Sequence, residues 1–300
     1  MRMPCAKLLV SLVLGLAVPV AMPSVSAAGE PATGPDAELQ TRIEKQIKEI
    51  EDRMMSLQEQ ELELSMKIMQ AQQKANEAIE NPGKAAEKLA KGESGGGLRQ
   101  YKAILMSCAR QLQAFNQRLT PVLKSVKALG RDRAKVPDPL KARIDTLTAR
   151  VESKHRTNLD KVAHTYKQCA EFRTALGIYL SLYKNMPAAE RVKDNVLTEN
   201  IGELYDKAGD PRKALLFYKS IFDAKPAKTR YTDRTLGMKV AALYVKCGDK
   251  RSAVGLYRAL YEALPKDKRS AKEGQDLMKK IEEIEGKSRQ PGGRDDKKRY

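Results

Sequence analysis

The C-terminal half of the chain repeats itself with a period of 39 residues, and this recurrence constrains the fold more than any other feature. The matched positions are Tyr166, Tyr205 and Tyr244; Ala175, Ala214 and Ala253; Tyr179, Tyr218 and Tyr257; Leu182, Ile221 and Leu260; and Pro187, Pro226 and Pro265. Small residues recur beside them at Ala163, Gly202 and Ala241, and a turn recurs at Ala170, Gly209 and Gly248. The pattern predicts three units of helix, tight turn, helix and proline stop.

This set of spacings resembles the tetratricopeptide repeat (TPR) family over residues 156–267. The three predicted units are residues 156–189, 195–228 and 234–267. The resemblance implies an α-solenoid of stacked helix pairs. The period is longer than the roughly 34 residues of that family, so each junction carries about five extra residues. The bulky residue expected near each start is Leu159 in the first unit but Thr198 and Gly237 in the others, so we expect looser first turns there.

The recurring tyrosines and small residues are interpreted as core, because Ala and Gly let two helices approach while Tyr and Leu fill the space beside them. Cys169 and Cys247 hold the same position two units apart, roughly 20 Å from each other for helices about 10 Å wide, so they cannot bond to one another. Cys5 lies in the predicted signal peptide described below, so cleavage would leave Cys108, Cys169 and Cys247. The odd count allows one disulfide or none, and we interpret the cysteines as buried packing residues.

Residues 38–130 are predicted to form a coiled-coil hairpin. The first helix carries apolar residues at heptad spacing, with Glu61 as one polar break: Ile43, Ile50, Leu57, Leu64, Ala71 and Ala78, and Ile47, Met54, Ile68 and Ala75. It should end near Glu80, before a flexible link at 81–97. The second helix carries a stripe in steps of four and three from Tyr101 to Leu129, with a kink expected at Pro121. Pairing within one chain and pairing between copies through residues 38–80 both fit this pattern.

Three further segments complete the architecture. A connecting helix is expected at 138–155, starting at Asp138 and Pro139 and able to run directly into the first unit. A capping helix is expected at 268–285, because the last unit of a solenoid needs its open face covered. Residues 286–300 are Gly-, Lys- and Arg-rich and are expected to be a disordered basic tail. The predicted fold class is therefore all-α: a coiled-coil hairpin, three TPR-like repeats and a capping helix.

Residues 1–28 have the three-part pattern of a secretory signal peptide: Arg2 and Lys7, an apolar run, then small residues before Gly29. An uncleaved anchor is the alternative, and the shortness of the run with its two prolines argues against it. Residues 29–37 read as a flexible leader. We therefore expect an exported protein, periplasmic or extracellular.

The composition holds little material for a catalytic centre. Aromatic residues make up 5% of the 300 residues, and there are two His and four Cys, which disfavours a large β-sandwich and a zinc site. We find no phosphate-binding loop, zinc-protease motif or nucleophile elbow. The sequence predicts a protein that is not an enzyme and uses no cofactor or metal. The net charge of +18 points to anionic surfaces as possible partners, with nucleic acid disfavoured by export.

The resemblance implies a partner-binding groove lined by the first helix of each unit. Nine positions are carried over: Asp160, His164 and Lys167; Glu199, Glu203 and Asp206; and Met238, Ala242 and Val245. Such a groove would run from mixed to acidic to apolar and suit an extended protein or peptide with a basic part and an apolar end. The order of leader, coiled coil and repeats is similar to that of the periplasmic coiled-coil/TPR cell-division coordinators associated with the Tol system, although residues 98–155 are not part of that layout.

The sequence leaves three functions open. The first is an exported scaffold or adaptor that binds a protein or peptide through its repeats, with the coiled coil for positioning or oligomerisation. The second is a charge-driven binder of an anionic envelope polymer or of nucleic acid. The third is a structural oligomer in which the coiled coil is the working part, the repeats serving only as spacers.

Overall fold

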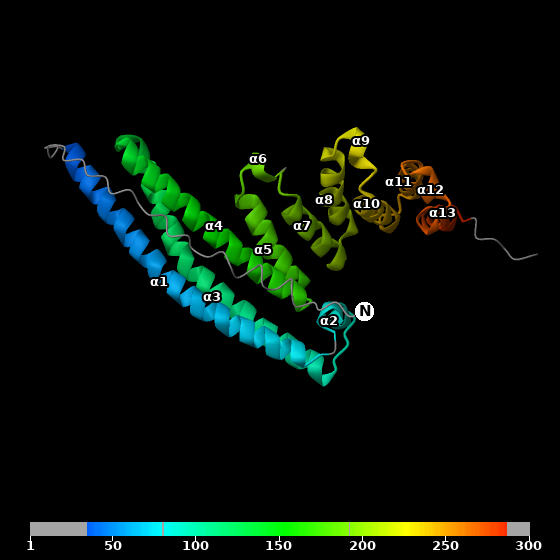
Figure 1. The fold of residues 1–300 in the computed structure, drawn as a ribbon, viewed down its shortest axis with the longest axis horizontal. Coiled ribbons are helices and arrows are strands. Elements are labelled where there is room, and N and C mark those ends of the chain that lie inside the picture. The colour runs from blue at the N-terminus through cyan, green and yellow to red at the C-terminus, as the bar shows by residue number, and fades with distance from the viewer. Residues whose placement is uncertain (1–34, 80, 192, 287–300) are drawn as a thin grey trace, which may run out of the picture.

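The structure, a computed structural model, describes residues 35–79, 81–191 and 193–286, and within them the chain forms helices and no strand. Three long helices make one end of an elongated molecule, and shorter helices follow one another toward the other end (Figure 1). The predicted all-α architecture is confirmed. No helix in these ranges is long and apolar enough to cross a membrane. The expected signal peptide, the leader up to residue 34 and the tail from residue 287 lie outside the described residues.

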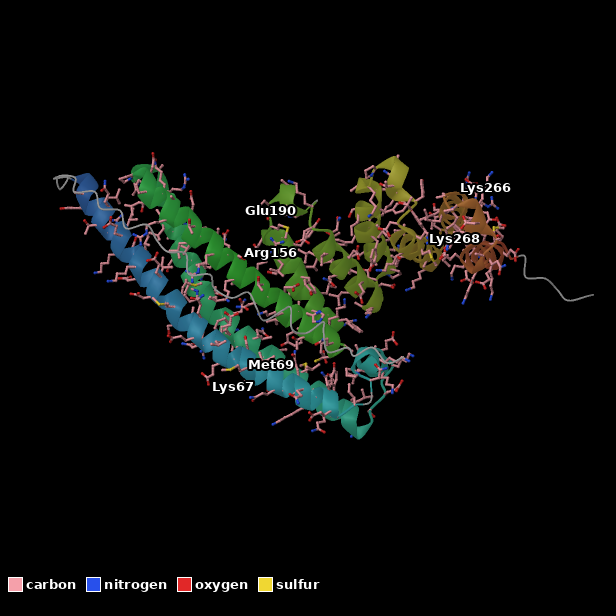
Figure 2. All side chains as sticks on the ribbon, viewed as in Figure 1. Lys67, Met69, Arg156, Glu190, Lys266 and Lys268 are labelled. Carbon is pink, nitrogen blue, oxygen red and sulfur yellow. The ribbon has the colours of Figure 1, made fainter. Side chains whose placement is uncertain are left out.

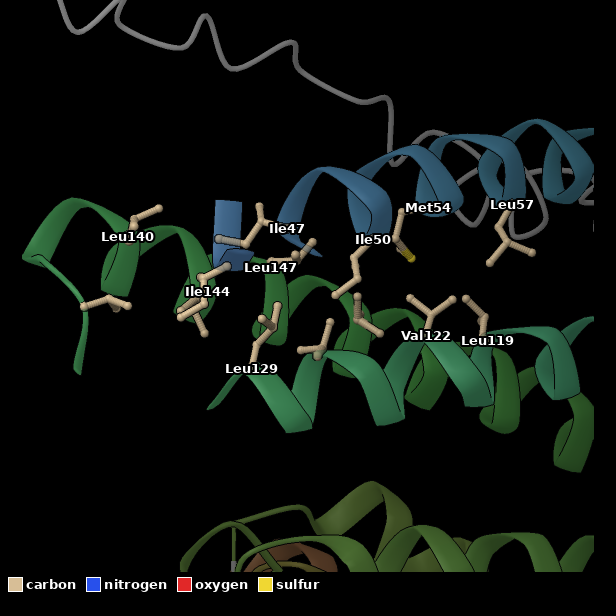
Figure 3. Close-up of a cluster of buried hydrophobic side chains, with 14 of the residues drawn as sticks. Ile47, Ile50, Met54, Leu57, Leu119, Val122, Leu129, Leu140, Ile144 and Leu147 are labelled. Carbon is tan, nitrogen blue, oxygen red and sulfur yellow. The ribbon is translucent and has the colours of Figure 1, made fainter. Parts of the chain in front are cut away.

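The long helices are α1 (Pro35–Glu77), α3 (Gly96–Asp132) and α4 (Asp138–Gln168), and α3 packs against both of the others. Most of the heptad seam of α1 is buried against other helices of its own chain, as the intramolecular hairpin predicts. Ile47 of α1 is fully buried and lies near Ile144 and Leu147 of α4, whereas Leu57 of α1 lies opposite Leu119 of α3 (Figure 3). α4 therefore shares the core of the hairpin formed by α1 and α3, and the three helices pack together along much of their length.

The segment expected to connect the hairpin to the repeats is one half of a longer helix. α4 continues without interruption from Asp138 to Gln168. Its first half packs on the hairpin through Leu140, Ile144 and Leu147, and its second half pairs with the next helix of the chain. The hairpin and the repeats thus share one rigid element, because no glycine or proline interrupts α4 after its first turn.

A polar layer divides the core of the three long helices. Glu61, the polar break in the heptad pattern, has a 13% exposed side chain that forms ion pairs with Lys154 and, at 3.8 Å, with Lys161, both from α4. At the same level Nδ2 of Asn116 lies 3.4 Å from Nε2 of His155. Asn158 is 1% exposed, and its amide makes no hydrogen bond to the described residues. The buried apolar side chains on the two sides of this layer form two clusters, and the partly buried Leu64 packs against both.

The link expected to be flexible at 81–97 contains the helix α2 (Pro82–Ala90), which corrects that prediction. Pro82 stands at the start of this helix, where a missing N–H costs nothing. The helix packs because Ala85 is fully buried in a small cluster with Tyr101 of α3 and Cys169 at the end of α4. Pro82 and Gly83 predict a break in the chain, whereas the Ala- and Lys-rich run that follows them favours a helix.

The ends of the long helices also differ slightly from the prediction. α1 begins at Pro35, within the segment taken as leader, and ends at Glu77 instead of near Glu80. α3 is a single helix from Gly96 to Asp132, with Pro121 inside it. Proline is tolerated there on the exposed side, where the lost backbone hydrogen bond is open to solvent.

The repeat region is built from successive helix pairs that follow the predicted period. The pairs are the second half of α4 with α5 (Phe172–Asn185), α7 (Asn195–Lys207) with α8 (Pro211–Ala224), and α10 (Arg234–Lys246) with α11 (Lys250–Glu262). The turns fall at the three predicted positions, where Ala170, Gly209 and Gly248 have φ values of 60°, 86° and 84°. Two of these positions carry glycine, the residue that adopts such angles at no steric cost.

The small residues at the helix crossings have the expected role. A Cβ atom added to Gly202 would lie 2.9 Å from the ring of Tyr218, which is 4% exposed. A Cβ atom added to Gly237 would lie 2.6 Å from Leu260. The looseness expected at the starts of the later units is absent in this region: Leu260 fills the space that a bulky residue at 237 would take, and Thr198 is 4% exposed with its hydroxyl donating to the carbonyl of Asp194.

The five extra residues of each period form a short helical turn with a recurring arginine. These turns are α6 (Ala188–Arg191), α9 (Ala227–Arg230) and α12 (Lys266–Arg269). Arg191 donates to the carbonyls of Met186 and Lys184 at 2.7 and 2.8 Å, at the end of the preceding helix, and lies 5.3 Å from the ring of Tyr183. Arg230 and Arg269 make the equivalent bonds and ring contacts. Each arginine therefore satisfies carbonyls that the helix end leaves unpaired.

The expected capping helix at 268–285 is α13 (Lys272–Glu285), preceded by α12. Leu277 and Ile281 are 3% and 2% exposed and belong to the same cluster as Tyr257 and Leu260 of the third unit. α13 packs against α11 as α10 packs against α8, so it covers the face that a fourth unit would otherwise cover.

Candidate partner-binding face

The nine residues predicted to line a groove lie on three successive helices at equivalent positions. Asp160, His164 and Lys167 lie on α4; Glu199, Glu203 and Asp206 on α7; and Met238, Ala242 and Val245 on α10. Ion pairs between these helices show that the three sets lie along one face of the repeat region. α4 also contacts the short helix α6, which follows the first unit: Arg156 of α4 pairs with Glu190 of α6 at 3.7 Å (Figure 2).

The carboxylates of the middle unit are paired with lysines rather than left open for a basic ligand. Glu203 bonds to Lys167 of α4 and, at 2.9 Å, to Lys207 on its own helix. The other two carboxylates are paired to α10: Asp206 with Lys246 at 2.6 Å, and Glu199 with Lys239 at 4.0 Å. The expected acidic stretch is thus largely offset, because its charges connect each first helix to the next.

The electrostatics of Glu203 are consistent with a structural bridge. Burial acts to raise the pKa of Glu203, but the hydrogen bonds and charges of Lys167 and Lys207 outweigh it, and the pKa is lowered from its ordinary value. Lys167 also donates to Oδ1 of Asn200 at 3.2 Å. The carboxylate is therefore ionised and held in place at neutral pH, where it stabilises the stacking of α4 on α7.

The third unit supplies the apolar end of the face, as expected. Ala242 is exposed and Val245 is 38% exposed, whereas Met238 is half-buried. Exposed apolar groups next to charged neighbours give a ligand somewhere to bury side chains. This end therefore has two exposed apolar side chains, whereas the residues named on α4 and α7 are polar or charged.

The first unit supplies polar groups that have fewer partners. Asp160 and His164 are both exposed. Burial, reinforced by the charge of Asp160, raises the pKa of Tyr179, whose ring is 1% exposed behind α4. Asp160 thus lies close to the buried tyrosine while its carboxylate remains open to solvent. The face accordingly runs from polar, through a paired middle, to apolar.

Two of the three described cysteines are packing residues, and Cys247 is half-buried, which corrects the expectation that all three are buried. All three described cysteines are free, and Cys108 and Cys169 are buried. Burial raises the pKa of the Cys169 thiol to about 12 and also raises that of Cys108. A thiol that stays protonated at neutral pH is a poor nucleophile and a poor metal ligand. Cys108 and Cys169 are therefore unsuited to redox or metal chemistry in the folded chain.

Two kinds of site matter for chemistry on the described surface, a metal centre and a small-molecule pocket. Among residues 35–79, 81–191 and 193–286, no group of three or more His, Cys, Asp or Glu is placed to hold a metal ion. One depression of about 480 Å³ lies between α11 and α13, open to solvent and lined by residues that include Lys250, Arg251 and Arg258. Arg258 there is already paired with Glu285 at 2.5 Å.

Comparison with known proteins leaves the family open. No protein-family model matches the chain, and no curated protein matches it. A search of solved structures found a circular tandem repeat protein with novel repeat topology and enhanced subunit contact surfaces. It shares 13% sequence identity over 84% of this chain, with a TM-score of 0.28. The match spans 64% of that protein, a little under two thirds of its length. At this TM-score we draw nothing from it, and the repeat architecture rests on the helix pairs described above.

Sequence reasoning missed the lysines that neutralise the face. Lys207 and Lys246 follow the 39-residue period, at the end of the first helix of the second and third units. That recurrence was a usable signal, as was the recurrence of Arg191, Arg230 and Arg269 at the junctions. Neither set stands out by composition, because exposed basic residues are abundant in a chain of charge +18.

Proposed function

We propose that the protein is a non-enzymatic scaffold that binds an extended protein or peptide segment across α4, α7 and α10. The observation that carries the proposal is the single face formed by three equivalent helices. Its apolar end at Ala242 and Val245 is open, and its polar end at Asp160 and His164 is solvent-exposed. A ligand with one apolar end fits this gradient.

The proposal further places the protein outside the cytoplasm, on the strength of the N-terminal pattern of residues 1–28, and within the TPR family, on the strength of the repeat spacing. Because the carboxylates in the middle of the face are already paired with lysines, we expect the ligand to be recognised mainly at the polar end and the apolar end of the face. Desolvating the ion pair of Glu203 with Lys167 would cost free energy that a short peptide does not return. A basic ligand centred on Glu199, Glu203 and Asp206 is therefore not favoured.

A site-specific crosslinker tests the face in the native cell. A photoreactive residue at Ala242 is compared with the same residue at Ala224, which is exposed at the end of α8. We expect a heteromeric adduct from position 242 and none from 224, and we expect Val245→Asp to abolish it without changing the thermal midpoint. Equal adducts at both positions, or an adduct that survives Val245→Asp, would contradict the proposed face.

The charge-driven alternative is supported by a different observation, the exposed cations of α3 described below. It predicts binding to an anionic polymer such as heparin that falls steeply with salt, in proportion to the number of contacts made. Capture at the repeat face depends on apolar burial and changes little between about 0.1 M and about 0.5 M salt. A salt series on the partner isolated by crosslinking therefore separates the two.

A further inference from the structure

The outward face of α1 carries apolar side chains with no cover in the described structure. Met55, Leu62, Met66 and Met69 are 59%, 63%, 48% and 54% exposed. They alternate in steps of three and four with the exposed carboxylates Asp52 and Glu59, which form no ion pair with other described residues. The acidic ridge, as we call it, is thus Asp52, Met55, Glu59, Leu62, Met66 and Met69. Large apolar side chains in a line on an exposed helix mark an interaction surface.

A second exposed face, on α3, has the opposite character. Reading backwards along the chain, the basic stripe is Arg131, Ala128, Lys124, Pro121, Gln117 and Ala114, all exposed. Its apolar members are small, and Lys124 and Arg131 form no ion pair within the described residues. Two other cations of α3 have partners on neighbouring helices: Arg118 donates to Gln60 of α1, and Lys127 pairs with Glu152 of α4 at 3.7 Å.

The two faces match position by position when one helix is reversed. Both advance in steps of three, four, three, four and three, so six levels coincide over about 26 Å of helix. At these levels the opposed residues are Asp52 and Arg131, Met55 and Ala128, Glu59 and Lys124, Leu62 and Pro121, Met66 and Gln117, and Met69 and Ala114. Carboxylates meet cations, and three large side chains meet small ones. A parallel arrangement with the same charge pairs runs past the end of α3.

We propose that the acidic ridge of one chain docks antiparallel on the basic stripe of a second copy. At the same six levels, antiparallel pairing of two ridges would leave Asp52 and Glu59 opposite apolar side chains, and pairing of two stripes would leave Arg131 and Lys124 opposite Ala114 and Pro121. The unlike pairing is the one that gives both carboxylates and both cations a partner of opposite charge. Within one chain α1 and α3 already contact each other through their buried seams, which leaves both outward faces available. The contact is heterologous: it joins two different surfaces.

A charge-exchange experiment tests the contact on the full-length exported chain. Variant one carries Asp52→Lys and Glu59→Lys, and variant two carries Lys124→Glu and Arg131→Glu. All four side chains are exposed, so both variants fold. The control carries Lys266→Glu and Lys268→Glu, which lie at the far end of the molecule from α1 (Figure 2). Mass is followed by sedimentation from about 1 to about 100 μM in about 0.05 M salt.

We expect the unaltered chain and the control to self-associate with concentration, and each variant alone to associate at least about tenfold more weakly. A one-to-one mixture of the two variants restores association, because each charge then meets its opposite. We expect Leu62→Asp to weaken self-association and Val245→Asp to leave it unchanged. This difference distinguishes the contact proposed here from the repeat face. The proposal is overturned if the unaltered chain is monomeric or if the mixture of variants stays monomeric. It is also overturned if variant two associates normally, which is the result that pairing of two ridges would give.

Discussion

Removal of the junction arginine should loosen the repeat region in a way that can be calculated from the structure. Arg191 donates through Nε and Nη2 to two carbonyls at 2.7 and 2.8 Å, and its guanidinium lies over Tyr183. A hydrogen bond involving a charged group contributes roughly 1.5–3 kcal/mol when buried. These groups are partly exposed, so we expect Arg191→Ala to lower the free energy of unfolding by about 2 kcal/mol.

The assay is urea unfolding followed by helical circular dichroism, with hydrogen exchange to locate the effect. Exchange should rise first in the last turn of α5 and in α6, because the freed carbonyls fray that end. Arg191→Lys keeps the charge but cannot reach both carbonyls with one planar fork, so it should lose about half as much. Lys193→Ala, an exposed neighbour, is the matched control and should stay within about 0.5 kcal/mol.

The period supplies an internal repetition of this experiment. Arg230 and Arg269 make the same bonds at the next two junctions, so each alanine variant should show a similar loss near its own junction. The reasoning fails if Arg191→Ala unfolds within about 0.5 kcal/mol of the unaltered chain, or if the increased exchange appears far from α5 and α6.

Three further predictions follow from contacts in the repeats. Gly202→Ala should destabilise the fold by about 1–3 kcal/mol, measured by urea unfolding, because the new methyl group would meet the ring of Tyr218. In the native chain a thiol reagent at pH 8 should modify half-buried Cys247 and spare Cys169, whose pKa is raised to about 12 by burial; equal rates would contradict this. Because the pKa of Glu203 is lowered, its stabilisation is complete above the ordinary carboxyl pKa and is lost as pH falls through the folded value, so Glu203→Gln should flatten stability between about pH 6 and pH 3.

The parts of the fold that the sequence predicted are those where a periodic pattern and the packing agree. The 39-residue recurrence located the turns, and the turn glycines at 209 and 248 have the positive φ that the pattern requires. The heptad positions of α1 are buried because they repeat at the spacing of a helix seam. In both cases the pattern lies within one stretch of sequence and recurs at several equivalent positions. The structure therefore agrees with the prediction at these positions.

The parts that were not predicted depend on what lies opposite in space. Glu199, Glu203 and Asp206 alone predict an acidic stretch of the face, but each has a lysine partner on a neighbouring helix. The segment 81–97 looked like a loop, yet Ala85 gains a buried site that no neighbouring residue in sequence provides. Pairwise contacts across helices are set by tertiary packing, which a reading of one helix at a time does not include.

The polar layer around Glu61 combines a sequence pattern with a contact between helices. It determines which side of α1 faces outward. Two apolar clusters in a three-helix core tolerate rotation or sliding at modest cost, since one aliphatic contact replaces another. A carboxylate that is 13% exposed and paired with Lys154 and Lys161 does not tolerate it, because any slip leaves charges buried without partners. The break in the heptad pattern therefore fixes the orientation of α1 against α4. By fixing that orientation it holds Met55 and Leu62 at the surface, where a hairpin with an unbroken seam would leave the choice of outward face to weaker contacts.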